Sequence, residues 1–272
     1  MAADAALNIA ALIALLPALL AAWKGESGPP TGRFWFLLAV AVAGPVVWTV
    51  AAAATATTDW RTDFSFALWV SVSASLCAFA AAAAFERNVA RLSPLFLALM
   101  TGLAVLATLS RGGSDAVPMA MAPGDGPWLW FHIGVSITTY ALLTVAAAAS
   151  LAALLQERAL KRKRPLKRLS GLPSVLDCES VVVRFLWLSA AVLALGMATG
   201  AAVNLTHGEP VMHLTHKTLF AIAAFAVICA LLFAHLKTGA RGRQVARLVL
   251  LAYLFVTLAY PGVKFVTSVL LA

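Results

Sequence analysis

The chain has 272 residues, of which 62% are hydrophobic and only 11% are charged. In a soluble domain about a quarter of the residues are charged, so this composition excludes an ordinary soluble globular protein. Apolar stretches of about 18 residues or more recur along almost the whole length, which predicts a polytopic helical membrane protein. The formal net charge of +9 could indicate a nucleic-acid partner. The basic residues, however, gather in short loops between apolar stretches, and we expect no nucleic-acid binding.

Eight membrane-spanning helices are predicted, and the expected fold class is all-α because no strand-like alternation of apolar and polar residues appears. In chain order the expected spans cover residues 5–23, 34–56, 64–85, 92–110, 127–156, 181–203, 214–236 and 245–270. The first apolar run lacks the positively charged segment of a cleavable signal peptide, so it is interpreted as a retained span.

The distribution of Lys and Arg predicts the orientation in the membrane. With the N-terminus outside, sixteen basic residues fall on the inner side, and only Arg61, Arg111, Lys217 and Lys264 fall on the outer side. We therefore expect a multi-pass protein of the bacterial inner membrane with both termini on the periplasmic side. The basic tract at residues 158–168 is either a topology anchor or a docking site for a cytoplasmic partner or anionic lipid.

The fifth predicted span carries a polar stripe. His132, Ser136, Tyr140 and Thr144 follow one another at intervals of four, which places them on a single helix face. Polar groups at membrane depth are costly unless they meet a partner, a cavity or a ligand. The stripe therefore predicts a face that looks onto a bound ligand, with His132 as its leading contact.

Other polar residues are expected at the same depth. Four of the five histidines lie at or beyond the outer ends of spans five, six and seven: His132, His207, His213 and His216. A single histidine at a helix end is usually an interfacial or hydrogen-bonded residue, but four on one side favour a site. A metal site involving His213 and His216 is not expected, since no zinc pattern such as H-E-x-x-H is present.

The eighth predicted span adds a second polar face. Tyr253, Thr257, Tyr260 and Lys264 are separated by four, three and four residues, which follows one face of a helix. Lys264 falls near the outer interface, where it either extends to the lipid headgroups or faces a carboxylate-bearing ligand. Imidazoles suit haem iron as axial ligands, and aromatic surroundings suit the macrocycle. No C-x-x-C-H occurs among the three cysteines, which excludes covalent c-type haem attachment.

Several blocks of the chain together resemble one protein family. They comprise Trp130-Phe131-His132 with Ser136, Tyr140, Leu151 and Gln156-Glu157-Arg158; then Thr215-His216-Lys217-Thr218; then Gly239 to Arg243; and finally Ala259 to Phe265. This pattern is similar to that of the cytochrome c assembly proteins, the CcsA-like and HemX-like integral membrane proteins that handle haem. The resemblance covers roughly spans three to eight and implies two N-terminal transmembrane helices in residues 1–60, followed by a six-helix domain in residues 61–272.

The resemblance implies a site as well as a fold. It implies non-covalent, b-type haem at the outer leaflet with His132 and His216 as axial ligands. Ser136, Tyr140 and Tyr260 would line this site, and Lys217 or Lys264 would neutralise the haem propionates. Dedicated assembly members carry a tryptophan-rich W-W-D segment, but residues 204–217 contain no Trp and no Asp, which points to the HemX-like branch. The expected partners are haem, the bilayer, and proteins of cytochrome c maturation or haem biosynthesis; enzymatic turnover is not expected.

Two alternatives stay open at this stage. A HemX-like protein could instead regulate tetrapyrrole biosynthesis through its basic cytoplasmic loop, which would make residues 158–168 the important segment. A small-molecule permease would need polar residues that continue to the inner side. Beyond Thr144, however, Ser150 is the only polar residue up to Leu155, so the pattern favours a one-sided pocket.

Overall fold

The computed structural model describes residues 2–24, 31–54, 64–110, 127–161, 171–206, 215–239 and 242–262, and among them it contains helices and no strands. The helices are α1 (Ala2–Trp23), α2 (Gly32–Ala54), α3 (Phe64–Phe85), α4 (Arg87–Ala90), α5 (Ser93–Leu109), α6 (Pro127–Lys161), α7 (Val175–Thr206), α8 (His216–Thr238) and α9 (Arg243–Thr257). A short π-helical turn, η3 (Leu258–Gly262), continues α9. The expected all-α fold is confirmed for the described part of the chain.

Six helices of the described chain are long and apolar enough to cross a membrane, namely α1, α2, α3, α6, α7 and α8. The protein is therefore a multi-pass membrane protein. Helix α5 has 17 residues and α9 has 15, and both coincide with predicted spans. Whether these two also cross, giving eight spans, stays a prediction. The short helix α4, which links α3 to α5, was not anticipated from the sequence.

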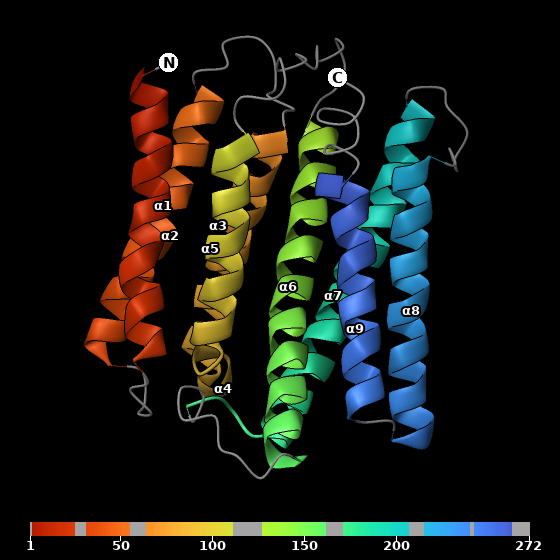
Figure 1. Cartoon of the computed structure of the whole chain (residues 1–272). Coiled ribbons are helices and arrows are strands. Elements are labelled where there is room, and N and C mark those ends of the chain that lie inside the picture. The colour runs from red at the N-terminus through yellow and green to blue at the C-terminus, as the bar shows by residue number, and fades with distance from the viewer. Residues whose placement is uncertain are drawn as a thin grey trace.

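The long helices stand side by side and alternate in direction along the chain (Figure 1). Helix α6 has a central place, because it packs against α7, α3, α9 and α5. The first residues of α6, the last of α7 and the turn η3 lie at one end of the bundle, and α1 also begins there (Figure 1). We call this the His132 end. It is at the top of the figure.

Small side chains allow the helices to approach one another closely. In α6 the run Ala146–Ala149 is almost completely buried within the core. Between α1 and α2, a Cβ atom added to Gly44 would lie only 2.6 Å from the Cβ atom of Ala14. Lipid provides no hydrophobic force that would drive one helix onto another, so such contacts hold the bundle by close packing.

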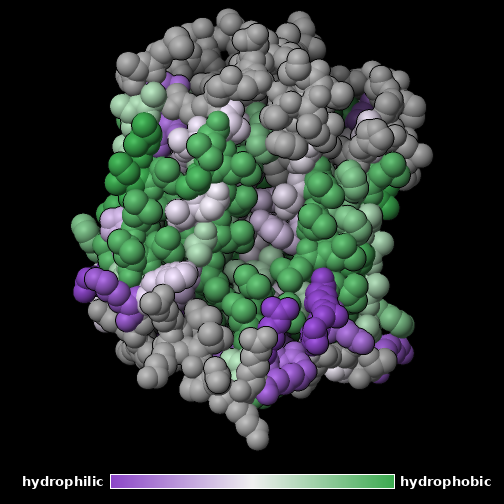
Figure 2. Space-filling view, viewed as in Figure 1, coloured by the Kyte–Doolittle hydropathy of each residue, from purple (hydrophilic) through white to green (hydrophobic). Residues whose placement is uncertain are grey.

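The end opposite His132 is polar and tied together by hydrogen bonds. The Arg91 side chain donates to the Gly171 carbonyl at 3.0 Å, and Arg184 forms an ion pair with Glu86 at 3.1 Å. Figure 2 shows hydrophobic side chains over the middle of the visible face, with hydrophilic ones gathered mainly toward this lower end. Most of the basic tract (residues 162–168) lies outside the described residues, so its proposed docking role stays a prediction.

Candidate functional site

His132 lies in the second turn of α6, where the beginning of α6 packs against the end of α7. Its imidazole is half-buried, and its Nδ1 atom lies 3.0 Å from the hydroxyl oxygen of Thr199. Thr199 is itself buried, and its hydroxyl donates to the backbone carbonyl of Gly196 at 3.0 Å. His132 is thus joined to the backbone of α7 through a single side chain.

Two glycines of α7 face the beginning of α6. A Cβ atom added to Gly200 would lie 3.0 Å from Cε1 of His132 and 3.6 Å from both ring nitrogens. A Cβ atom added to Gly196 would lie 3.3 Å from a methyl group of Val135. The absence of side chains at these two positions therefore lets α6 approach α7 closely, and we call the contact surface at Gly196 and Gly200 the cradle.

Sequence reasoning missed this cradle and Thr199 with it. The available signal was Gly196-Met-Ala-Thr199-Gly200, whose two glycines four residues apart form the small-xxx-small pattern of close helix contacts in membranes. That pattern indicates a close contact, but it does not say which helix makes it. The pairing with His132 became visible only from the arrangement of the helices.

Two further hydroxyls of the stripe, those of Ser136 and Thr144, donate within their own helix. The Ser136 hydroxyl donates to the carbonyl of His132 at 2.9 Å, and the Thr144 hydroxyl donates to the carbonyl of Tyr140 at 2.7 Å. Such bonds to the preceding turn satisfy a hydroxyl without help from a ligand. For Ser136 and Thr144, polarity alone is therefore a weaker argument for a ligand than the sequence suggested.

Tyr140 makes a contact between helices. It is 1% exposed, and its phenolic oxygen lies 3.0 Å from that of Tyr253 in α9, with the two ring centroids 5.6 Å apart. The polar faces predicted on the fifth and eighth spans do face each other at this level. This hydrogen bond joins α6 to α9 inside the bundle.

The other predicted site residues are placed less completely. His216 and Lys217 open α8, and Tyr260 lies in η3, which packs against α8. Their backbone therefore lies at the His132 end (Figure 1), but the structure does not describe their side chains. Lys264, His207 and His213 lie wholly outside the described residues. Their roles, including the pairing of His132 with His216, stay predictions.

Aromatic side chains flank His132 on α6. Trp128, Trp130 and Phe131 are each close to half exposed, and the rings of Trp128 and Phe131 lie 5.9 Å apart. An exposed aromatic surface of this kind suits a membrane–water interface and can also pack against a flat apolar ligand. Among the described residues no group of three or more His, Cys, Asp or Glu could hold a metal ion. A polydentate protein metal site is thus not found in the described chain, whereas haem, which brings its own four nitrogens, needs only one or two protein ligands.

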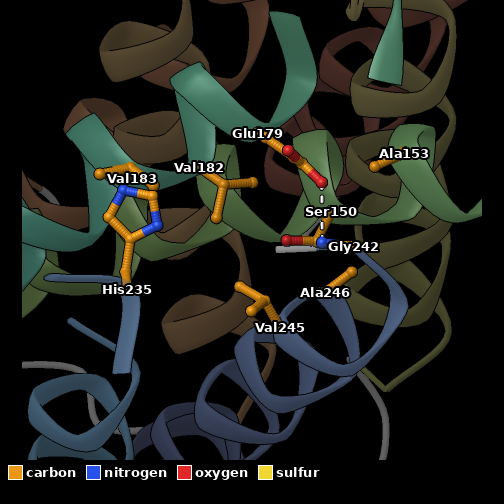
Figure 3. A pocket seen from close by; sticks show the side chains of 9 residues that line it. All are labelled: Ser150, Ala153, Glu179, Val182, Val183, His235, Gly242, Val245 and Ala246. Atoms are coloured by element: carbon orange, nitrogen blue, oxygen red, sulfur yellow. Dashed lines mark hydrogen bonds between the residues drawn. The ribbon is translucent and has the colours of Figure 1, made fainter. Parts of the chain in front are cut away.

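A second polar cluster lies at the opposite end, between α6, α7, α8 and α9 (Figure 3). The backbone N–H of Gly242, at the start of α9, donates to the Glu179 carboxylate at 2.7 Å. His235 and the buried hydroxyl of Ser150 line the same cavity, and the Ser150 hydroxyl has no hydrogen-bond partner among the described residues. The cavity volume is about 20 Å³, room for about one water molecule. This cluster is too small for a substrate, and we interpret it as part of the helix packing.

Comparisons with known proteins identify the family of this chain. The family model described as "Cytochrome C assembly protein" matches residues 34–271, which extends from the beginning of α2 across the remaining described helices. A protein of Azospirillum brasilense, described as an uncharacterized 28.8 kDa protein in the nifR3-like 5′ region, is 46% identical over 268 residues. That alignment covers 97% of each chain. No solved structure matches significantly. The match covers most of the chain, which shows that this protein belongs to the cytochrome c assembly protein family.

Proposed function

We propose that this protein holds haem at the outer face of the bacterial inner membrane during cytochrome c biogenesis, with His132 as an axial ligand of the iron. Membership of the family supports a role in cytochrome c biogenesis and implies haem handling. The observation that carries the assignment to His132 is its setting. The imidazole is half-buried, is oriented by Thr199, and lies over a glycine in the contact between α6 and α7.

The residues around His132 are chemically suited to bind haem. A neutral imidazole is a common haem ligand, and the cradle on α7 restrains its ring from one side. The exposed aromatic side chains of α6 next to it offer flat apolar surface for a macrocycle. Because the chain has no C-x-x-C-H, such a haem would be non-covalent and of b type.

The remaining parts of the site follow from the family resemblance. His216, at the start of α8, is the proposed second axial ligand. Ser136, Tyr140 and Tyr260 would line the site, and Lys217 or Lys264 would pair with the propionates. Haem is cargo in this proposal: the protein binds and presents it, and no chemical conversion by the protein is required.

The distribution of charge supports placing the His132 end outside. The described Arg and Lys side chains of the loops and helix ends gather at the opposite end, among them Arg87, Arg91, Lys161 and Arg243. Such an excess marks the cytoplasmic side of short-loop membrane proteins. The regulatory and permease alternatives remain untested predictions. No contact in the described chain favours either of them over haem binding.

The test is purification of the full chain in mild detergent from haem-replete cells, followed by an absorption spectrum. We expect a Soret band in the wild type and its loss in His132→Ala and in His216→Ala. His235→Ala is the matched control, because this histidine lies in the last turn of α8 at the opposite end of the bundle. Wild-type protein without haem, or a Soret band that persists in His132→Ala, would refute the assignment.

A further inference from the structure

The hydrogen bonds of Thr199 constrain the protonation of His132. A threonine hydroxyl has one proton to donate and two lone pairs to accept with. In this structure the proton is used in the bond to the Gly196 carbonyl at 3.0 Å. The same oxygen lies 3.0 Å from Nδ1 of His132, so toward the imidazole it can only accept. Both bonds form together when Nδ1 of His132 carries the proton and donates it to Thr199.

We propose that Thr199 is a positioning residue that holds neutral His132 in the tautomer protonated at Nδ1, the tautomer whose Nε2 lone pair can bind haem iron. This inference rests on the proposed function for its ligand, but the tautomer itself is a property of the protein without haem. In the other tautomer Nδ1 carries no proton, and Thr199 must then give up either its bond to Gly196 or its bond to His132. The chain His132 Nδ1–H, Thr199 O–H, Gly196 C=O keeps both bonds.

Thr199 is a suitable hydrogen-bond partner for a histidine at this depth in the membrane. Ligating histidines in proteins commonly donate their other ring N–H to a carboxylate or carbonyl, which fixes the ring and strengthens the ligand. A carboxylate at this depth would be costly to bury. A hydroxyl that already donates to a backbone carbonyl is a polarised acceptor without a net charge, and it gives the same orientation. Thr199 is 3% exposed, so water does not readily replace it.

Gly200 completes the arrangement by limiting where the ring can lie. The Gly200 Cα position faces the Cε1 edge of His132, since an added Cβ would be 3.0 Å from that carbon. The imidazole is therefore bounded by the α7 backbone on one side and bonded at Nδ1 on another. These two contacts come from adjacent residues of α7, and both restrain the orientation of the ring.

The direct test is nitrogen NMR of the haem-free full chain in detergent, with ¹⁵N-labelled histidine and His132→Ala to assign the signal. The two ring nitrogens are told apart by their couplings to the ring protons, and the protonated one by its shift. We expect wild-type His132 at neutral pH to carry its proton on Nδ1. A wild-type proton on Nε2 would overturn the proposal without any need for a variant at position 199.

Two variants extend the test to haem. Thr199→Val keeps the shape of the side chain and removes the hydroxyl, while Thr199→Ser keeps the hydroxyl and is the matched control. We expect Thr199→Val to lose the single tautomer and to bind haem on the order of tenfold more weakly, the low end of effects for groups that orient metal ligands. Thr199→Ser should behave as the wild type in both measurements.

The outcomes separate this proposal from the proposed function. If Thr199→Val matches the wild type in tautomer and haem affinity while His132→Ala loses haem, the role of Thr199 is refuted and haem ligation by His132 stands. If His132→Ala keeps its haem, ligation by His132 is refuted. The tautomer of the haem-free protein then still decides whether Thr199 sets the protonation of the ring.

Discussion

Gly200→Ala is expected to weaken haem binding at the proposed site, and the structure gives the size of the effect. The new methyl carbon would lie 3.0 Å from Cε1 of His132 and 3.6 Å from each ring nitrogen. Non-bonded carbon atoms prefer separations of about 3.5–4.0 Å, so the imidazole or helix α7 has to move by roughly half an ångström or more. Backbone lies on one side of this contact and a side chain tied to Thr199 on the other, so neither moves freely.

Overpacking of this kind costs roughly 1–3 kcal/mol. If that cost falls on the orientation of the ring that would bind haem, the haem affinity should drop about 5- to 140-fold, because each 1.4 kcal/mol or so corresponds to a factor of ten. The assay is a spectral titration of the haem-free protein in detergent with haem, read at the Soret band.

Gly134→Ala is the control for this experiment. It adds the same methyl group to α6, two residues after His132, at a position where an added Cβ meets nothing within 4 Å. Any general effect of replacing a helical glycine with alanine is therefore shared by the two variants. The reasoning is refuted if Gly200→Ala binds haem as tightly as Gly134→Ala while both are folded.

Two further predictions concern the packing around the site. Tyr140→Phe and Tyr253→Phe each remove one member of the buried phenol pair, so each should destabilise the protein by about 1 kcal/mol. The double variant should cost less than the sum of the two, which a double-mutant cycle on thermal unfolding in detergent would measure; strictly additive costs would contradict the contact. Glu179→Ala removes the acceptor of the Gly242 N–H at the start of α9 and should lower the free energy of unfolding by roughly 1–3 kcal/mol. Glu179→Gln keeps an acceptor oxygen and should lose less, and equal losses in the two variants would contradict a role for the hydrogen bond.

The helices themselves could be predicted from the sequence because their causes are local. Within lipid a chain must satisfy its own backbone hydrogen bonds, so each long apolar run becomes a helix of nearly the same bounds, as α3 (Phe64–Phe85) does. Spacing by four also placed His132, Ser136 and Tyr140 on one face, because the helical period alone decides this. The short α4 was missed, since four residues between two apolar runs carry too little periodicity to recognise.

The tertiary structure decided which residues of other helices those faces contact. The rotation of each helix about its axis depends on how small and large side chains interlock with neighbours that are distant in sequence. Thus Thr199 and Gly200 reach His132 across 67 and 68 positions, and Tyr253 reaches Tyr140 across 113. The sequence by itself determined that a membrane bundle exists and that His132 lies on a polar face near one end of it. Only the packing of α6 against α7 determined that this histidine is bonded to a threonine and lies over a glycine, because that contact depends on two helices at once.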